Sequence, residues 1–174
     1  MFNLPVKFDQ NEWFVLTVMV VLISAFYLSP KPFSKQVILG IMLFHSVYGL
    51  TVDMIIGVSY PWDFYNTMDT KGYDLCDFFI YTINYPIYGY FFAYFMTLWL
   101  QRGRSPLAFI AIWVLISALS ELAAVICNVY QYKNGWNIGF SVISYVVIFS
   151  SSAFFVTFIT SLQNKPKGNK ITNF

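Results

Sequence analysis

Charged residues are scarce in this sequence. Asp, Glu, Lys and Arg make up only 10% of its 174 residues, whereas an average soluble domain carries about 25%. Hydrophobic residues make up 58% of the chain and aromatic residues 21%. This composition excludes an ordinary soluble domain and predicts an integral membrane protein, with residues 1–174 forming a single transmembrane domain.

Most motifs that mark well-known chemistries are missing too. The chain has one histidine, His45, so a multi-histidine metal or haem centre is excluded. It has no C-x-x-C, H-E-x-x-H, G-x-S-x-G or Walker sequence, which removes the well-marked thiol oxidoreductases, hydrolases and nucleotide enzymes. The net charge of +2 comes without a basic run interleaved with aromatic residues, so a nucleic-acid partner is not expected. No cofactor is expected either.

Five apolar segments are each long enough to cross the hydrocarbon core, which takes about 20 helical residues. They cover residues 12–29, 36–58, 76–100, 106–130 and 137–162. Their connections are short, except for an acidic stretch over residues 59–75. The sequence therefore predicts an all-α fold, an integral membrane bundle of five transmembrane helices.

The distribution of Lys and Arg over the connections predicts the orientation of this bundle. One side receives Lys31, Lys35, Arg102, Arg104, Lys165, Lys167 and Lys170. The other side receives Lys7, Lys71 and Lys133, together with Asp9, Glu12, Asp63, Asp69 and Asp74. Because cytoplasmic connections carry an excess of positive charge, we expect the N-terminus outside and the C-terminus in the cytoplasm.

A few polar side chains fall inside the apolar segments and follow helical spacing. Charged groups at membrane depth cost about 2.5–3.5 kcal/mol each on insertion scales, so they indicate function by default. The third segment places on one helix face Asp77, Tyr81, Asn84 and Tyr88. The fourth segment does the same with Ser117, Glu121, Ala124 and Asn128. The second segment carries on one side His45, Gly49 and Asp53.

The first segment has only Thr17 and Ser24 in its middle, so we expect it at the lipid-facing periphery. The other stripes then face a shared interior, because lipid cannot satisfy polar groups. At a rise of about 1.5 Å per residue, the acidic residues gather in the outer half of the bundle. The sequence predicts an outward-opening pocket lined by Asp53, Asn84 and Glu121, with His45 at its floor and Asp77 at its mouth.

Asp53 and Glu121 are the residues best suited to chemistry in this pocket. Two neighbouring carboxylates can share a proton, hold a hard cation through oxygen ligands or polarise a substrate. His45 can relay a proton or bind a metal as neutral imidazole. The alternative is that these groups only link neighbouring helices by hydrogen bonds, at about 0.6 kcal/mol per contact.

Two further features concern the third and fourth segments. Pro86 removes a backbone donor inside the third segment, so a kink is expected there. Cys76 and Cys127 are both expected near the outer face, where a disulfide is topologically allowed but two unpaired thiols are the default. The outer loop lacks the EF-hand spacing, which favours a solvated acidic loop with aromatic residues on the membrane surface over a divalent-cation site.

Several stretches of the chain resemble a family of small five-span membrane proteins from endospore-forming bacteria. The similarity rests on residues 50–53, 60–65, 69–74 and 130–136, on Asp77 and on Glu121. It extends over nearly the whole chain, but none of its motifs is diagnostic of a reaction. The resemblance implies five helices in a bacterial cytoplasmic membrane, and it implies no activity and no catalytic residue.

The leading interpretation is a non-enzymatic membrane protein that binds a small ligand, a cation or a lipid in the outward-facing pocket. A small proton- or ion-coupled transporter would use the same acidic residues. An accessory or structural subunit would turn its polar faces toward a partner's helices, and a membrane-embedded lipid-modifying enzyme would need Asp53 with Glu121 or His45 as its acid–base pair. The expected partners are membrane lipids and, within the membrane, another protein or a second copy of the chain.

Overall fold

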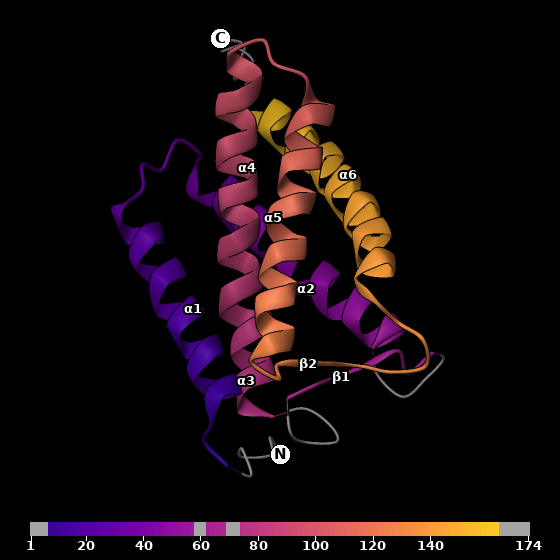
Figure 1. Cartoon of the computed structure of the whole chain (residues 1–174). Coiled ribbons are helices and arrows are strands. Elements are labelled where there is room, and N and C mark those ends of the chain that lie inside the picture. Colours follow the sequence, from indigo (N-terminus) through magenta and orange to yellow (C-terminus); the bar gives the residue numbers. More distant parts are fainter. Residues whose placement is uncertain (1–6, 58–61, 69–73, 164–174) are drawn as a thin grey trace, which may run out of the picture.

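The computed structural model describes residues 7–57, 62–68 and 74–163, and most of them are helical (Figure 1). The elements in chain order are α1 (Gln10–Leu28), α2 (Lys35–Ile56), β1 (Tyr65–Thr67), α3 (Leu75–Phe79), the π-helix η1 (Ile80–Asn84), α4 (Tyr85–Gln101), α5 (Pro106–Ile126), β2 (Tyr130–Tyr132) and α6 (Ile138–Gln163). The predicted helical class is confirmed, whereas the two short strands are not part of that prediction. Residues 59–61 and 69–73 of the predicted acidic loop over 59–75, and the cationic residues beyond 163, lie outside the described residues.

Among the described residues, four helices are long and apolar enough to cross a membrane: α1, α2, α5 and α6. Large apolar side chains are exposed on them, for example Leu28, Leu107 and Ile126. Such a surface suits lipid rather than water, so the structure supports a membrane protein. The predicted third span is not one of the four, because the chain over 75–101 is divided among α3, η1 and α4.

Close packing of helices forms the core of the bundle. α2 packs along α4 and α5 packs along α6, while α1 rests on α3, η1 and α4 (Figure 1). Gly49 lies against the ring of Tyr85 and Gly89 lies against the imidazole of His45, so the small residues let α2 and α4 approach closely. Next to this contact is an aromatic cluster, with ring centroids 5.3–5.6 Å apart, made of Phe92, Phe109, Trp113 and Phe149.

A π-helical turn precedes Pro86. Pro86 has no N–H to offer to the carbonyl of Thr82, and its ring presses against that carbonyl. The backbone N–H of Tyr85 bonds the carbonyl of Ile80, five residues earlier, which widens the turn. The disturbance predicted at Pro86 therefore takes the form of a π-turn, and it lies where Asn84 and Tyr85 face the interior of the bundle.

The two strands form an antiparallel pair that lies across one end of the bundle (Figure 1). In their register Tyr65 is opposite Tyr132. The chain enters β2 because α5 ends at Ile126 and Asn128 then adopts a left-handed conformation, with φ 58°. The fourth predicted span, which extends to residue 130, is therefore four residues too long.

Candidate functional site

A cavity of about 530 Å³ lies inside the bundle, next to the strand pair. It is partly open, and its walls come from α1, α2, η1, α4, α5 and α6. Small-molecule sites have volumes of about 300–1,000 Å³ and are mostly apolar with a few convergent polar groups. This cavity agrees with both criteria, because apolar side chains dominate its walls and a small set of polar side chains faces it.

Five of the residues predicted to form the pocket line this cavity: His45, Asp53, Asn84, Tyr88 and Glu121. They come from α2, η1, α4 and α5, so the polar faces of these elements meet in one interior space. Tyr81 is not part of the lining. It is buried in a cluster with Val15, Cys76 and Ala124 on the α1 side of the bundle, and its side chain also interacts with the carboxylate of Asp53.

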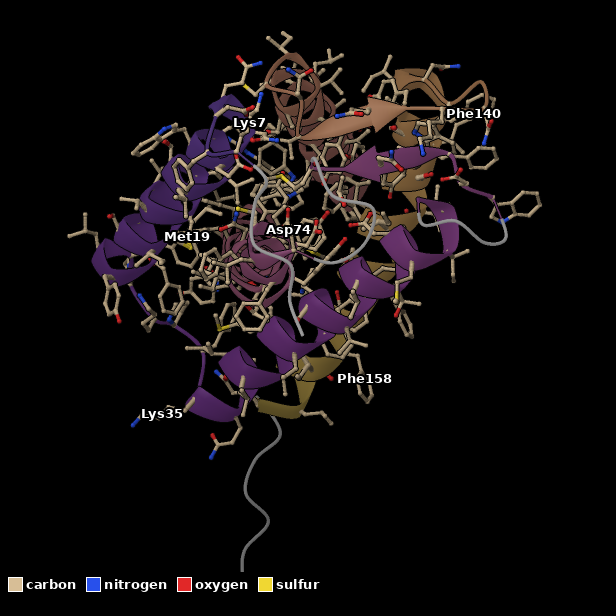
Figure 2. All side chains as sticks on the ribbon, turned by 90° about the horizontal axis from the view of Figure 1, so that it is seen from below. Lys7, Met19, Lys35, Asp74, Phe140 and Phe158 are labelled. Carbon is tan, nitrogen blue, oxygen red and sulfur yellow. The ribbon has the colours of Figure 1, made fainter. Side chains whose placement is uncertain are left out.

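Asp77 does not lie at the mouth of this cavity, which corrects the prediction. It is 2% exposed and its side chain accepts a hydrogen bond from the backbone N–H of Asp74. The carboxylate of Asp74 in turn accepts from the backbone N–H groups of Cys76 and Asp77. This reciprocal cap fixes the first turn of α3 and holds Asp77 away from the cavity. Figure 2 shows Asp74 near the middle of this end of the bundle, not in a solvated loop.

Asn128 does not line the cavity either. The sequence places it on the polar face of the fourth segment, one turn after Ala124, but α5 ends at Ile126. Asn128 is exposed and takes the left-handed conformation that turns the chain toward β2, a conformation for which asparagine is well suited. The prediction that Asn128 shares the polar face of the fourth segment is wrong because the helix ends before this residue.

The carboxylate of Asp53 is held by two tyrosines. The hydroxyl of Tyr65 donates to Oδ1 at 2.6 Å, and the hydroxyl of Tyr85 donates to Oδ2 at 2.8 Å. The hydroxyl of Tyr130 lies 3.1 Å from that of Tyr85 and extends the network to β2. Each oxygen of Asp53 therefore has its own charge-assisted hydrogen bond.

The carboxylate of Glu121 is satisfied on one side only. Its Oε1 accepts from the hydroxyls of Tyr132 and Ser141, both at 2.7 Å. Ser141 also accepts from the indole N–H of Trp136 at 2.9 Å, which fixes its position. The second oxygen, Oε2, is buried and has no hydrogen-bond partner among the described residues, while the hydroxyl of Tyr145 lies near the carboxylate.

Three tyrosines of the strand pair complete this network, and helical spacing does not predict them. Tyr65 comes from β1, and Tyr130 and Tyr132 come from alternate positions of β2, which point to the same face of a strand. Burial raises the pKa of all three hydroxyls, and the charge of Asp53 raises those of Tyr65 and Tyr130 further. They therefore stay protonated and act as donors. The alternation Tyr-Gln-Tyr was the available signal, but three residues are too few to separate a strand from a turn.

His45 and Asn84 also present unpartnered atoms in the cavity wall. Nδ1 of His45 lies 2.8 Å from the carbonyl oxygen of Ile41, which can only accept, so Nδ1 carries the proton. In the neutral ring Nε2 is then an acceptor, and it is buried without a partner within the described part of the chain. Oδ1 of Asn84 is likewise buried and has no hydrogen-bond partner among the described residues.

The two carboxylates of the cavity have no cationic partner among the residues that the structure describes. Among those described residues the one ion pair joins Nζ of Lys133 to Oδ1 of Asp63 at 3.5 Å, and it lies outside the cavity. The hydrogen bonds of Asp53 and Glu121 come from neutral hydroxyl groups, so in the described part of the cavity wall a negative charge on either carboxylate has no cation to balance it.

α1 lies at the periphery of the bundle, as predicted, with most of its side chains exposed, and it also forms part of the cavity wall. Phe14, Thr17, Val18 and Val21 of α1 line the cavity. Residues of α5, including Ala123, line the same cavity, while most of the close contacts of α1 are with α3, η1 and α4. The low polar content of α1 thus predicts its exposed outer side, while its inner side contributes an apolar wall.

A second group of carboxylates is buried at the same end of the molecule. Glu12, Asp74 and Asp77 each keep one oxygen without a hydrogen-bond partner in the described residues. Their other oxygens cap α1 and α3, since Glu12 bonds the N–H of Asp9 and Asp77 bonds that of Asp74. Within the described ranges no group of three His, Cys, Asp or Glu has the arrangement to hold a metal ion. Helix capping accounts for these residues.

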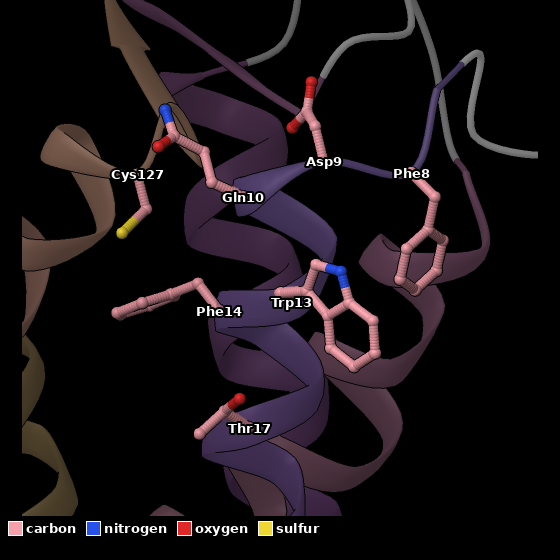
Figure 3. A pocket seen from close by; sticks show the side chains of 7 residues that line it. All are labelled: Phe8, Asp9, Gln10, Trp13, Phe14, Thr17 and Cys127. Atoms are coloured by element: carbon pink, nitrogen blue, oxygen red, sulfur yellow. The ribbon is translucent and has the colours of Figure 1, made fainter.

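The two cysteines are free thiols, Cys76 buried and Cys127 partly exposed. The disulfide that the sequence allowed is therefore not formed, and the default of two unpaired thiols agrees with the structure. Cys127 borders a shallow groove beside the first turns of α1, where Figure 3 shows it across from Gln10 and Phe14.

The cavity combines apolar surface with a few polar side chains. The hydrogen bond of His45 is to a backbone carbonyl, and the Ser141 hydroxyl that donates to Glu121 at 2.7 Å also accepts from the indole N–H of Trp136. What the wall offers is negative charge, hydrogen-bond acceptors and apolar surface. No protein-family model, curated protein or solved structure matches this chain.

Proposed function

We propose that this protein binds a small molecule in its intramembrane cavity, with Glu121 as the principal contact. The observation that carries the proposal is the unpartnered Oε2 of Glu121, buried in the wall of a cavity of about 530 Å³. A buried polar group without a hydrogen bond costs about 1–3 kcal/mol, and more when charged. A bound ligand that donates to this oxygen would remove that cost.

Structural linkage between helices explains the same residues less well. Helix-linking groups would be expected to satisfy one another, as Tyr88 and Ser117 do at 2.7 Å. Glu121, His45 and Asn84, which line the cavity, instead each have a buried atom without a partner among the described residues. Several unpartnered atoms on one cavity support a ligand site.

We also propose that the chain crosses the membrane five times, with the N-terminus outside. α3, η1 and α4 follow one another without interruption over 27 residues, about 40 Å at 1.5 Å per residue. This length exceeds the hydrocarbon core of about 30 Å. Arg102 and Arg104 follow α4 at the end opposite to the strands, which supports a cytoplasmic location for that end. The cavity then lies in the outer half, in a bacterial cytoplasmic membrane.

This topology predicts the labelling of Cys127. A membrane-impermeant maleimide added to intact cells should modify Cys127, because the thiol is partly exposed and lies at the end of α5 near the strands. Cys76 is buried and should react only after denaturation. Mass spectrometry of the labelled peptides measures both reactions. Labelling of Cys127 only in inside-out vesicles would reverse the orientation.

Native mass spectrometry of the protein, purified in a mild detergent from its own membrane, tests the binding function. We expect a small molecule to remain bound to the wild type and its occupancy to fall at least tenfold in Glu121→Gln. Asp63→Asn is the matched control, since it removes a carboxylate that pairs with Lys133 outside the cavity. Equal occupancy in both variants would contradict the proposal.

A transporter is the second candidate function, favoured by the π-turn of η1. π-turns inside helices are frequent at functional sites, and this one presents Asn84 to the cavity immediately before Pro86. Such a turn can change register as a ligand moves. Proton flux into liposomes carrying the protein, lost in Glu121→Gln, would distinguish a transporter from a binder.

A further inference from the structure

We propose that the ligand is a lipophilic amine, an apolar molecule that ends in a protonated ammonium group, and that it enters from the bilayer between α1 and α5. This inference rests on the proposed binding function and adds the chemical class of the ligand and its route. Three observations carry it: the acceptors of the cavity wall, its charge and the apolar side of the cavity.

The free atoms of the cavity wall call for a ligand that donates hydrogen bonds. Oε2 of Glu121 is an acceptor, and so is Nε2 of His45 while Nδ1–H is donated to the carbonyl of Ile41. The amide of Asn84 can present either its oxygen or its NH₂ group. An ammonium group has up to three N–H donors and accepts none, so it complements these atoms. A carboxylate or phosphate would bring further acceptors to the same place.

The charge of the site points to the same class. Glu121 and Asp53 receive hydrogen bonds from neutral hydroxyls, and within the described residues no Lys or Arg reaches them. Tyr132 of β2 donates to Glu121, and Tyr130 of β2 contacts the Tyr85 hydroxyl that donates to Asp53. Tyr130 and Tyr132 are two residues apart, a spacing of about 7 Å along a strand. A single positive group near Glu121 would therefore interact favourably with both carboxylates.

Asp53 and Glu121 play different parts in this arrangement. Both oxygens of Asp53 already accept from tyrosines, so Asp53 contributes charge and no free acceptor. Glu121 keeps one oxygen free and is the expected direct contact. Loss of Glu121 should therefore weaken binding more than loss of Asp53.

The apolar part of the ligand has a place along α1. Thr17, Val18 and Val21 line the cavity, as does Ala123 of α5, and these two helices are not among the closely packed pairs. Aromatic side chains of the cavity wall, including Tyr145 and Trp136, provide faces that attract a cation. An amphipathic amine can thus keep its hydrocarbon near lipid while its ammonium group reaches Glu121.

Equilibrium binding of tritiated dodecylamine to the full chain in phosphatidylcholine nanodiscs tests the class of ligand, with empty nanodiscs as the reference. We expect saturable binding to the wild type, at least tenfold weaker binding to Glu121→Gln and a smaller loss in Asp53→Asn. Unlabelled dodecanol and dodecanoate should not displace the amine at a hundredfold excess. Displacement by either of them as effective as by dodecylamine would overturn the proposal, as would equal binding to Glu121→Gln.

A steric variant tests the route and does not touch the carboxylates. Ala123→Phe should fill the cavity on its α5 side and weaken dodecylamine binding at least tenfold. Ala111→Phe is its matched control, the same substitution on an exposed position of α5 that does not line the cavity, and should bind as the wild type does. Unchanged binding in Ala123→Phe, with a melting temperature like that of the control, would exclude entry between α1 and α5.

The native mass measurement separates failure of this inference from failure of the binding function. If Glu121→Gln loses a bound molecule that contains no basic nitrogen, the binding function stands and the amine class is wrong. If Glu121→Gln retains all bound molecules of the wild type and binds dodecylamine equally well, both proposals are wrong.

Discussion

Replacement of Gly89 by alanine is expected to destabilise the protein by about 2 kcal/mol. A Cβ at this position would overlap the imidazole of His45, and the hydrogen bond of that ring to the Ile41 carbonyl at 2.8 Å keeps it from moving aside. Overpacking of a core costs about 1–3 kcal/mol, and the higher helix propensity of alanine returns up to about 1 kcal/mol. Unfolding in a denaturing detergent titrated into mild micelles, followed by tryptophan fluorescence, measures the difference.

Gly40→Ala is the control for this prediction. Its Cβ would meet only the end of the Ile159 side chain, which can change rotamer, so its free energy of unfolding should stay within about 1 kcal/mol of the wild type. Equal stability of Gly89→Ala and Gly40→Ala would show that α2 and α4 do not pack as closely as described.

Replacement of Tyr85 by phenylalanine is expected to destabilise the protein by about 2 kcal/mol. It removes the hydroxyl that donates to Oδ2 of Asp53 at 2.8 Å and that meets the hydroxyl of Tyr130. A hydrogen bond to a charged group contributes about 1.5–3 kcal/mol, and the charge of Asp53 would lose one of its two donors. Unfolding in mixed micelles again gives the free-energy difference.

Tyr88→Phe, about one helical turn further along α4, is the matched control. Tyr88 bonds the neutral hydroxyl of Ser117 at 2.7 Å, and contacts of this kind within membranes average about 0.6 kcal/mol. In an Asp53→Asn background the effect of Tyr85→Phe should fall to a similar size, because the acceptor no longer carries charge. A loss of stability that is the same in both backgrounds would contradict the role assigned to the carboxylate.

The helices were the most predictable part of this protein. Apolar length alone locates three of them to within two residues at each end: the segments 12–29, 36–58 and 137–162 correspond to α1, α2 and α6. Hydrophobicity specifies where a chain enters lipid, but it says little about where a helix ends inside a tertiary structure. The fourth segment, 106–130, therefore overran α5, which ends at Ile126.

The candidate site was predictable only where helical spacing controls it. His45, Asp53, Asn84, Tyr88 and Glu121 line one cavity because they lie on inward faces of helices. Tyr65, Tyr130 and Tyr132 depend on the pairing of two strands about 65 residues apart in sequence, and no local pattern records such a pairing. The prediction for Asp77 was wrong because its carboxylate accepts a hydrogen bond from the backbone N–H of Asp74, the residue that begins the capping box, and does not face the cavity.

The strand pair also constrains when the site can form during synthesis. Asp53 and Tyr85 emerge from the ribosome well before Tyr130 and Tyr132, and β1 has no partner until β2 has been made. During that interval Glu121 lacks the Tyr132 and Ser141 hydroxyls that bond it in the finished protein. The closing of the site is therefore a late, long-range event, coupled to the arrival of α6. A chain truncated before residue 130 would hold both acidic residues in its helices with the site left unassembled.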